Sequence, residues 1–145
     1  MAGYGGPRPQ GNDHRRGHAG GHVLRSCRHP FLTTATIDRL RDLYPQGRFE
    51  VRRFRPNIVV EPASGEKIFV ENAWIGHRIA IGDEVCLRIT GPCPRCVMTT
   101  LPQGDLPRDP GILRTAAQHN QVNVGVYAAV LRGGTIRRGD PIRFE

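Results

Sequence analysis

Residues 77–89 have the sequence HRIAIGDEVCLRI, and this stretch decides the fold class. Two short segments rich in β-branched residues, 77–81 and 84–89, flank Gly82-Asp83, a dipeptide typical of turns. Similar segments, bounded by Pro, Gly, Asn and Asp, recur at 49–54, 57–61, 67–70, 124–131, 135–137 and 141–144. The pattern predicts a mainly β fold with a strand at each of these segments.

Two helical segments accompany the strands. Apolar residues recur at spacings of three and four from Ile37 to Tyr44, with Thr33 or Thr34 available as the N-cap and residues 45–47 (PQG) as the stop. Residues 112–120 favour a further short helix. We therefore expect two or three short helices beside the strands.

Length and composition favour one domain. The chain has 145 residues and a mass of 16.1 kDa. Its longest apolar run, residues 124–131, is far shorter than the ~18 residues that a membrane-spanning helix needs. Residues 1–29 also lack the apolar centre of a secretory signal. We therefore expect a cytoplasmic protein without a membrane partner.

Residues 1–29 differ in composition from the rest of the chain, because they hold seven Gly and four of the six His with almost no apolar residues. Such a segment buries too little apolar surface to offset its ordering entropy. We predict a disordered Gly/His/Arg-rich tail at 1–29 and a folded domain at 30–145. His14, His18 and His22 have the spacing of helical metal ligands, but the glycines between them oppose a helix and favour adventitious metal binding only.

The formal net charge is +8, and 20 of the 21 basic residues are Arg. Residues 1–29 carry five Arg and one Asp, so +4 of this charge belongs to the tail. The rest of the chain has no basic run longer than two residues, and no aromatic residues interleave with Arg as stacking platforms for bases. We therefore do not expect nucleic acid as a partner.

Residues 53–57 (RFRPN) contain a possible anion-binding pair. Pro56 fixes its own φ and favours an extended conformation for Arg55. A guanidinium donates a planar fork and an amide both donates and accepts, so Arg55 and Asn57 can together hold a phosphate or the edge of a heterocycle. The alternative is a turn with one exposed Arg.

The quartet Cys93-Pro94-Arg95-Cys96 allows three interpretations. A structural zinc site needs a second pair of ligands, which the remaining cysteines do not form. A redox pair needs its first Cys at the start of a helix, whereas residues 97–100 (VMTT) have the pattern of a strand. The third interpretation is one thiolate as a soft transition-metal ligand, favoured by the positive charges of Arg95 and Arg55. Spacing alone does not choose between them.

Taken together and in this order, these motifs resemble the MOSC domain, which is named after the C-terminal domain of molybdenum cofactor sulfurases. The resemblance runs from about Pro30 to Glu145. The matching motifs are 31–36 (FLTTAT), 53–60 (RFRPNIVV), Trp74, 81–83 (IGD), 93–100 (CPRCVMTT), Asn123, Gly125, Tyr127 and 139–142 (GDPI). The resemblance implies a distorted β-barrel that binds molybdenum cofactor (molybdopterin), a pterin dithiolene carrying a phosphate.

The resemblance also implies roles for individual residues. In amidoxime-reducing components and their bacterial counterparts, the Cys of the Arg-Cys motif ligates molybdenum, and this position is Cys96 here. The Arg and Asn that lie at the cofactor correspond to Arg55 and Asn57. The hydroxyls at the helix start correspond to Thr33 and Thr34, where a phosphate is well placed. Arg95, next to the thiolate, completes the expected cofactor-binding set, and Arg55, Asn57 and Cys96 are expected in one pocket.

The resemblance implies a molybdenum cofactor-dependent oxidoreductase that reduces N-oxygenated small molecules with electrons from a separate donor protein. In sulfurase-linked members the family is associated with sulfur transfer, so a carrier or cofactor-delivery domain with a Cys persulfide is the alternative. Related proteins have a further N-terminal β-rich stretch that this sequence lacks. We therefore expect a truncated gene product, for which a non-catalytic fragment is a third possibility.

Overall fold

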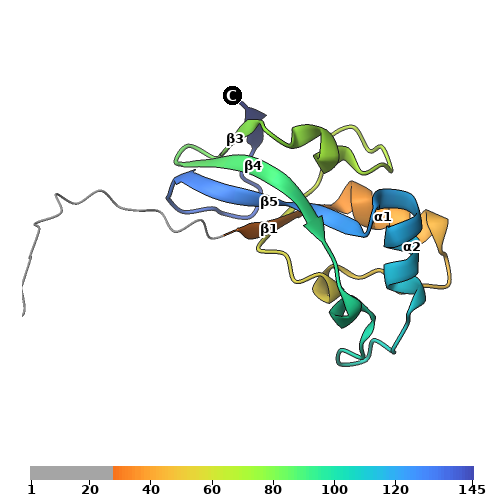
Figure 1. Cartoon of the computed structure of the whole chain (residues 1–145). Coiled ribbons are helices and arrows are strands. Elements are labelled where there is room, and N and C mark those ends of the chain that lie inside the picture. The colour runs from red at the N-terminus through yellow and green to blue at the C-terminus, as the bar shows by residue number, and fades with distance from the viewer. Residues whose placement is uncertain (1–27) are drawn as a thin grey trace, which may run out of the picture.

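The computed structural model describes residues 28–145 and contains one curled, six-stranded sheet that forms a half-barrel (Figure 1). The strand order is β2-β1-β5-β4-β3-β6. The strands are β1 His29–Thr33, β2 Ile58–Val60, β3 Arg78–Ile81, β4 Val85–Pro94, β5 Asn123–Arg132 and β6 Ile142–Phe144. Only the pair β1 and β2 is parallel. The expected mainly β fold is confirmed, whereas the predicted tail lies, up to residue 27, outside the described residues.

Two α-helices, α1 (Thr34–Leu43) and α2 (Gly111–Asn120), lie side by side at one end of the sheet (Figure 1). Thr33 caps α1, because its hydroxyl accepts a hydrogen bond from the amide of Thr36 at 3.2 Å. The prediction of a helix capped by Thr33 or Thr34 is therefore confirmed. Three short 3-10 helices complete the elements: η1 Val51–Arg53, η2 Val70–Trp74 and η3 Val97–Thr100.

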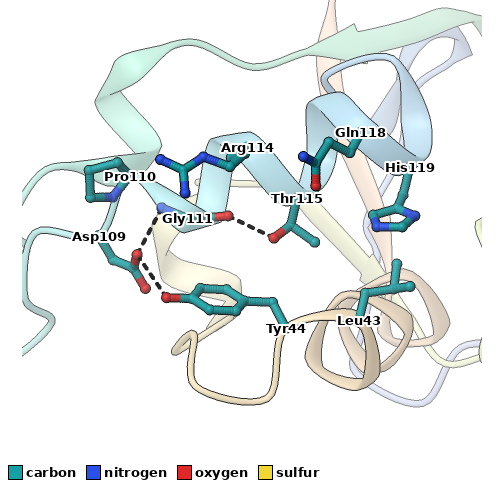
Figure 2. A pocket seen from close by; sticks show the side chains of 9 residues that line it. All are labelled: Leu43, Tyr44, Asp109, Pro110, Gly111, Arg114, Thr115, Gln118 and His119. Carbon is teal, nitrogen blue, oxygen red and sulfur yellow. Dashed lines mark hydrogen bonds between the residues drawn. The ribbon is translucent and has the colours of Figure 1, made fainter.

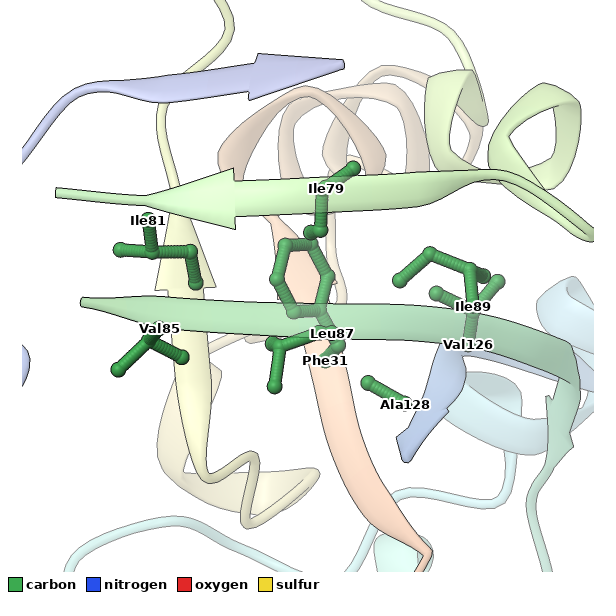
Figure 3. Close-up of a cluster of buried hydrophobic side chains, with 8 residues drawn as sticks. All are labelled: Phe31, Ile79, Ile81, Val85, Leu87, Ile89, Val126 and Ala128. Atoms are coloured by element: carbon green, nitrogen blue, oxygen red, sulfur yellow. The ribbon is translucent and has the colours of Figure 1, made fainter. Parts of the chain in front are cut away.

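Strand β1 is buried on both faces of the sheet, because its neighbouring residues Phe31 and Leu32 point to opposite faces and are both inaccessible to solvent. Phe31 belongs to a cluster formed by β1, β3, β4 and β5 (Figure 3). Leu32 belongs to a second cluster, in which both helices pack with Phe49 and Phe54. The second cluster fixes the segment on which the candidate site depends.

The strand predicted at 49–54 is wrong, because η1 occupies this segment. Phe49 and Phe54 are five residues apart and would lie on opposite faces of a strand, yet both belong to the same buried cluster. A 3-10 turn between them brings both rings to one side.

The strand predicted at 67–70 is also wrong, since η2 begins at Val70 and places Glu71 beneath α1. Residues 135–137 form no strand either; the amide of Thr135 donates to the carboxylate of Glu84 rather than to a neighbouring strand. At Thr135 a hydrogen bond to a side chain thus replaces the expected ladder.

Strand β4 continues past the predicted end at residue 89 to Pro94. Its pairing with β5 is irregular at three places, and these irregularities accommodate the two prolines, Pro92 and Pro94, within the strand. As a result, β4 carries the chain directly to Arg95 and Cys96.

Candidate functional site

Cys96 lies two residues past the end of β4 and is the N-cap residue of η3. Its side chain is exposed, whereas Cys93 is 1% exposed. The side chain of Cys93 interacts with that of Tyr127 and is the main reason that the pKa of the Tyr127 hydroxyl is raised. Cys96 is therefore the member of the Cys-x-x-Cys pair that an incoming ligand or reagent can reach.

The strand predicted at 97–100 is wrong, because these residues form η3. The hydroxyls of Thr99 and Thr100 donate to the carbonyls of Cys96 and Val97 at 3.0 and 2.6 Å, and so stabilise a tight turn. A thioredoxin-like arrangement remains unsupported, since the helical turn starts at the second Cys rather than the first.

Arg95 joins three parts of the chain through main-chain carbonyls. Its Nη1 donates to Phe54 O at 2.6 Å, and its Nε and Nη2 donate to Val124 O at 2.9 and 2.7 Å. The guanidinium also lies over the Phe54 ring, 5.6 Å from the centroid. Burial lowers the pKa of Arg95 from its ordinary value. The guanidinium of Arg95 already donates to the carbonyls of Phe54 and Val124. A direct contact between Arg95 and the cofactor therefore competes with these hydrogen bonds.

Arg53 makes a second connection and is only 2% exposed. Its Nε donates to Arg48 O at 2.9 Å, Nη1 to Thr99 O at 3.2 Å and Nη2 to Pro107 O at 2.9 Å. Among residues 28–145 it has no carboxylate partner, so carbonyl oxygens alone solvate the charge. Arg53 and Arg95 therefore hold the segment 48–55 against the loop that follows Cys96.

Arg55 and Asn57 lie on the turn between η1 and β2, and both side chains are exposed. The predicted extended conformation of Arg55 is wrong, because its φ is +47°. The chain must reverse here between buried Phe54 and the amide of Asn57, which donates to Pro30 O at 2.8 Å. A non-glycine residue in the left-handed region before a proline is strained.

Thr33 faces inward rather than toward a surface pocket. Its hydroxyl donates to Glu71 Oε2 at 2.7 Å while it caps α1, and the hydroxyl of Thr36 donates to the same oxygen at 2.7 Å. Glu71 is buried, and burial is the main reason that its pKa is raised. Thr34 is half-buried and has no side-chain hydrogen bond within the described part of the chain.

Sequence reasoning did not identify Arg53 or Glu71. The available signal for Glu71 was a lone acid in the mainly apolar segment 67–75 (KIFVENAWI). Its hydrogen-bond partners could not be predicted from this signal, because they are more than 30 residues away in the sequence. Nothing in the sequence distinguishes Arg53 from the nearby Arg52 and Arg55.

An ion-pair network on the surface holds the loop after η3 in place. Asp105 accepts from Arg48 at 3.0 Å and from Arg52 at 2.5 Å, and Glu50 accepts from both arginines. These hydrogen bonds lower the pKa of Asp105 to about 2. At the surface, this network joins residues 48–52 to the loop of Asp105. Arg53 joins the same two segments in the interior.

Two cavities of note occur in the structure, and neither is lined by Cys96, Arg55 or Asn57. One, of about 330 Å³, lies between the end of α1 and the start of α2 (Figure 2). The other, of about 230 Å³, lies beside Tyr127 and Arg28. The Cys96 thiol instead lies at an open surface beside the exposed side chains of Val97 and Met98.

The family model of the MOSC domain matches residues 29–143, and the chain therefore belongs to the MOSC domain family. It is 33% identical over 112 residues to mitochondrial amidoxime reducing component 2 of Rattus norvegicus, covering 67% of this chain and 31% of that protein. It is 30% identical over 135 residues to mitochondrial amidoxime-reducing component 1 of Mus musculus, covering 83% and 38%. The chain thus spans about a third of the length of these relatives.

The fold also resembles a solved structure. YiiM from Geobacillus stearothermophilus superposes with a TM-score of 0.55 at 13% identity, covering 81% of this chain and 53% of that one. At this identity the likeness concerns the fold alone.

Residues 28–145 lack two features of interest. They contain no helix long and apolar enough to cross a membrane. They also contain no group of three or more His, Cys, Asp or Glu side chains arranged to hold a metal ion.

Proposed function

We propose that this MOSC domain binds molybdenum cofactor, with the Cys96 thiolate as the protein ligand of the metal. Accessibility of the thiol carries the proposal, because Cys96 is exposed while Cys93 and Cys86 are buried. A single thiolate suffices, since the dithiolene of the pterin supplies further sulfur ligands and soft sulfur suits this metal. The names and family of the relatives support the same choice of cofactor.

The residues near Cys96 fit an anionic pterin. Arg55 and Asn57 carry exposed donors, and Arg95 holds their turn against the loop of Cys96 through Phe54 O. We propose that the Arg55 fork takes the phosphate and that Asn57 takes the edge of the pterin. Thr34 is a third candidate contact, while Thr33 and Arg95 contribute by holding the helix start and the turn in position.

The reaction that we propose is reduction of N-oxygenated small molecules, as the names of the relatives suggest. The cofactor supplies the two-electron chemistry when bound. Electrons come from a separate donor protein, and we propose a cytoplasmic location. Within this chain, the Cys96 thiolate adjusts the electron density of the metal, and the surface beside Val97 and Met98 admits the substrate or the donor.

An accessible thiol also suits sulfur transfer, and the exposure of Cys96 favours this as the second candidate. In that case a Cys96 persulfide is the working species; it forms when the Cys96 thiolate attacks the outer sulfur of a persulfide on an external donor, whose inner sulfur leaves as a thiolate. The two functions differ in what the purified protein carries: molybdenum and pterin in the first, sulfane sulfur in the second.

The test is to produce the chain in a host that makes molybdenum cofactor, and to measure molybdenum, pterin and sulfane sulfur in the purified protein. We expect Cys93→Ser to contain as much molybdenum and pterin as the wild type. Cys96→Ser should contain neither. Sulfane sulfur without molybdenum would select the second candidate. A wild-type protein with none of the three would contradict both.

A further inference from the structure

The cavity between the two helices has no part in the proposed function. It is lined by Leu43, Tyr44, Asp109, Pro110, Gly111, Arg114, Thr115, Gln118 and His119 (Figure 2). Its volume of about 330 Å³ falls at the lower end of the range for small-molecule sites. Most of its lining side chains are polar, although the cavity lies between two helices of the domain.

One wall of the cavity is built around Tyr44. A Cβ atom on Gly47 would lie 2.4 Å from its ring, and one on Gly111 would lie 2.5 Å from it, so two glycines make room for this ring. The Tyr44 hydroxyl lies 3.4 Å from Asp109 Oδ1, a long hydrogen bond, and the amide of Gly111 donates to the same oxygen at 2.8 Å. These contacts orient the Asp109 carboxylate and leave Oδ2 without a partner among the described residues.

The other wall comes from one face of α2, where Arg114, Thr115, Gln118 and His119 recur at helical spacing. Thr115 is engaged, because its hydroxyl donates to Gly111 O at 2.7 Å. The guanidinium of Arg114 makes no hydrogen bond or ion pair with any residue from 28 to 145. Leu43, at the end of α1, lies across from His119 and adds an apolar side chain to the lining (Figure 2).

Two opposite charges therefore line one cavity without pairing. Arg114 and Asp109 are five residues apart, yet the structure contains no ion pair between them within residues 28–145. A ligand that carries both a carboxylate and an ammonium can satisfy both charges at once, and it has no net charge to oppose its entry. A purely anionic ligand would instead lie close to Asp109.

We propose that this cavity binds a small zwitterion of the α-amino acid class. The carboxylate of the ligand binds the Arg114 fork, with the Gln118 amide as a further donor. The ammonium donates to Asp109 Oδ2, and the side chain of the ligand packs against Leu43. The site is separate from Cys96 and does not depend on the proposed cofactor.

The test is a titration of ¹⁵N-labelled full-length protein with L-alanine and L-leucine, followed by amide chemical shifts. We expect saturable shifts at Gly111, Thr115 and Gln118. Acetate and ethylammonium, which each carry one of the two charged groups, should bind at least about tenfold more weakly. Absence of saturable shifts at these amides with both amino acids, or equal affinity for acetate, would overturn the proposal.

Two variants localise the binding. Arg114→Gln removes the charge, and Asp109→Asn keeps an acceptor for the Gly111 amide while it removes the anion. Each should weaken binding about tenfold or more, whereas Arg108→Gln, an exposed arginine outside the cavity, should not change it. Equal binding by all three variants would contradict the site. The amide spectra show whether each variant is folded, and molybdenum content reports on Cys96 independently.

Discussion

The guanidinium of Arg95 donates a 2.6 Å hydrogen bond to the main-chain carbonyl of Phe54 and lies against the ring of the same residue. Since Arg55 follows Phe54 and Cys96 follows Arg95, this one contact brings together two motifs that are 41 residues apart in the sequence. Positioning by Arg95 is therefore as important to the candidate site as any side chain that reaches the surface.

Replacing Arg95 with Lys keeps the charge but removes the planar fork that bonds to Phe54 O and Val124 O. We expect the free energy of unfolding to fall by about 1.5–3 kcal/mol. Urea denaturation measures this, with Arg88→Lys, an exposed arginine on β4, as the matched control. Equal urea midpoints for the two variants would show that the fork is dispensable.

Replacing Arg53 with Met leaves the carbonyls of Arg48, Thr99 and Pro107 without their donor in a buried place. We expect a loss of about 3 kcal/mol or more in the free energy of unfolding, also measured by urea denaturation. Arg52→Met, at the neighbouring exposed position, should have a much smaller effect, because it removes surface ion pairs only. Similar losses for both would contradict the role assigned to Arg53.

Two substitutions at Arg55 separate backbone strain from ligand binding, because its φ is +47°. Arg55→Gly and Arg55→Val both remove the guanidinium, and both should lower the molybdenum content. Only Val is strained in this conformation, so we expect it to be less stable than Gly by about 1–2 kcal/mol in thermal or urea unfolding. Full molybdenum content in both variants would exclude a contact between Arg55 and the cofactor.

The buried carboxyl of Glu71 predicts how the stability of the folded chain depends on pH. Burial raises its pKa in the folded chain, so the folded state binds this proton more tightly than the unfolded state does. The contribution of Glu71 to the stability of the folded state is therefore fully present at pH values below the ordinary pKa of a glutamate. It is lost as the pH rises through the raised pKa of the folded chain. Compared with Glu71→Gln, the wild type should lose stability from pH 4 upward in thermal melts. A constant difference between the two across this range would contradict the shift.

The accessibility of the thiols can be measured directly. Iodoacetamide should modify Cys96 in the folded protein well before Cys93 or Cys86, because only Cys96 of these three is exposed. Peptide mass spectrometry after a time course distinguishes the sites, and denatured protein provides the reference rates. Modification of Cys93 as fast as Cys96 would remove the basis for choosing between them.

The sequence predicted the elements whose signals are local. The helix from Thr34 to Leu43 has a cap, a periodic apolar face and a stop within about 15 residues, and β3 and β5 have β-branched runs bounded by turns. The MOSC family itself could be identified from the order of short motifs and is confirmed.

Elements that depend on distant partners could not be predicted in the same way. The segment 49–54 has the composition of a strand, but the carbonyls that surround Arg53 come from residues more than 40 positions away as well as from nearby. The extension of β4 through Pro92 and Pro94 depends on its irregular pairing with β5. Long-range contacts of this kind override local preference.

Strand β5 lies at the centre of the sheet although it is the penultimate strand in the chain. During synthesis, the pair β1 and β2 and the pair β3 and β4 remain two separate pieces until residues 123–132 emerge and join them. Val124, which anchors Arg95, belongs to the same strand. The turn of Arg55 and the loop of Cys96 therefore come together only once β5 has been made and has paired with β1 and β4, so closure of this surface depends on contacts between distant parts of the sequence.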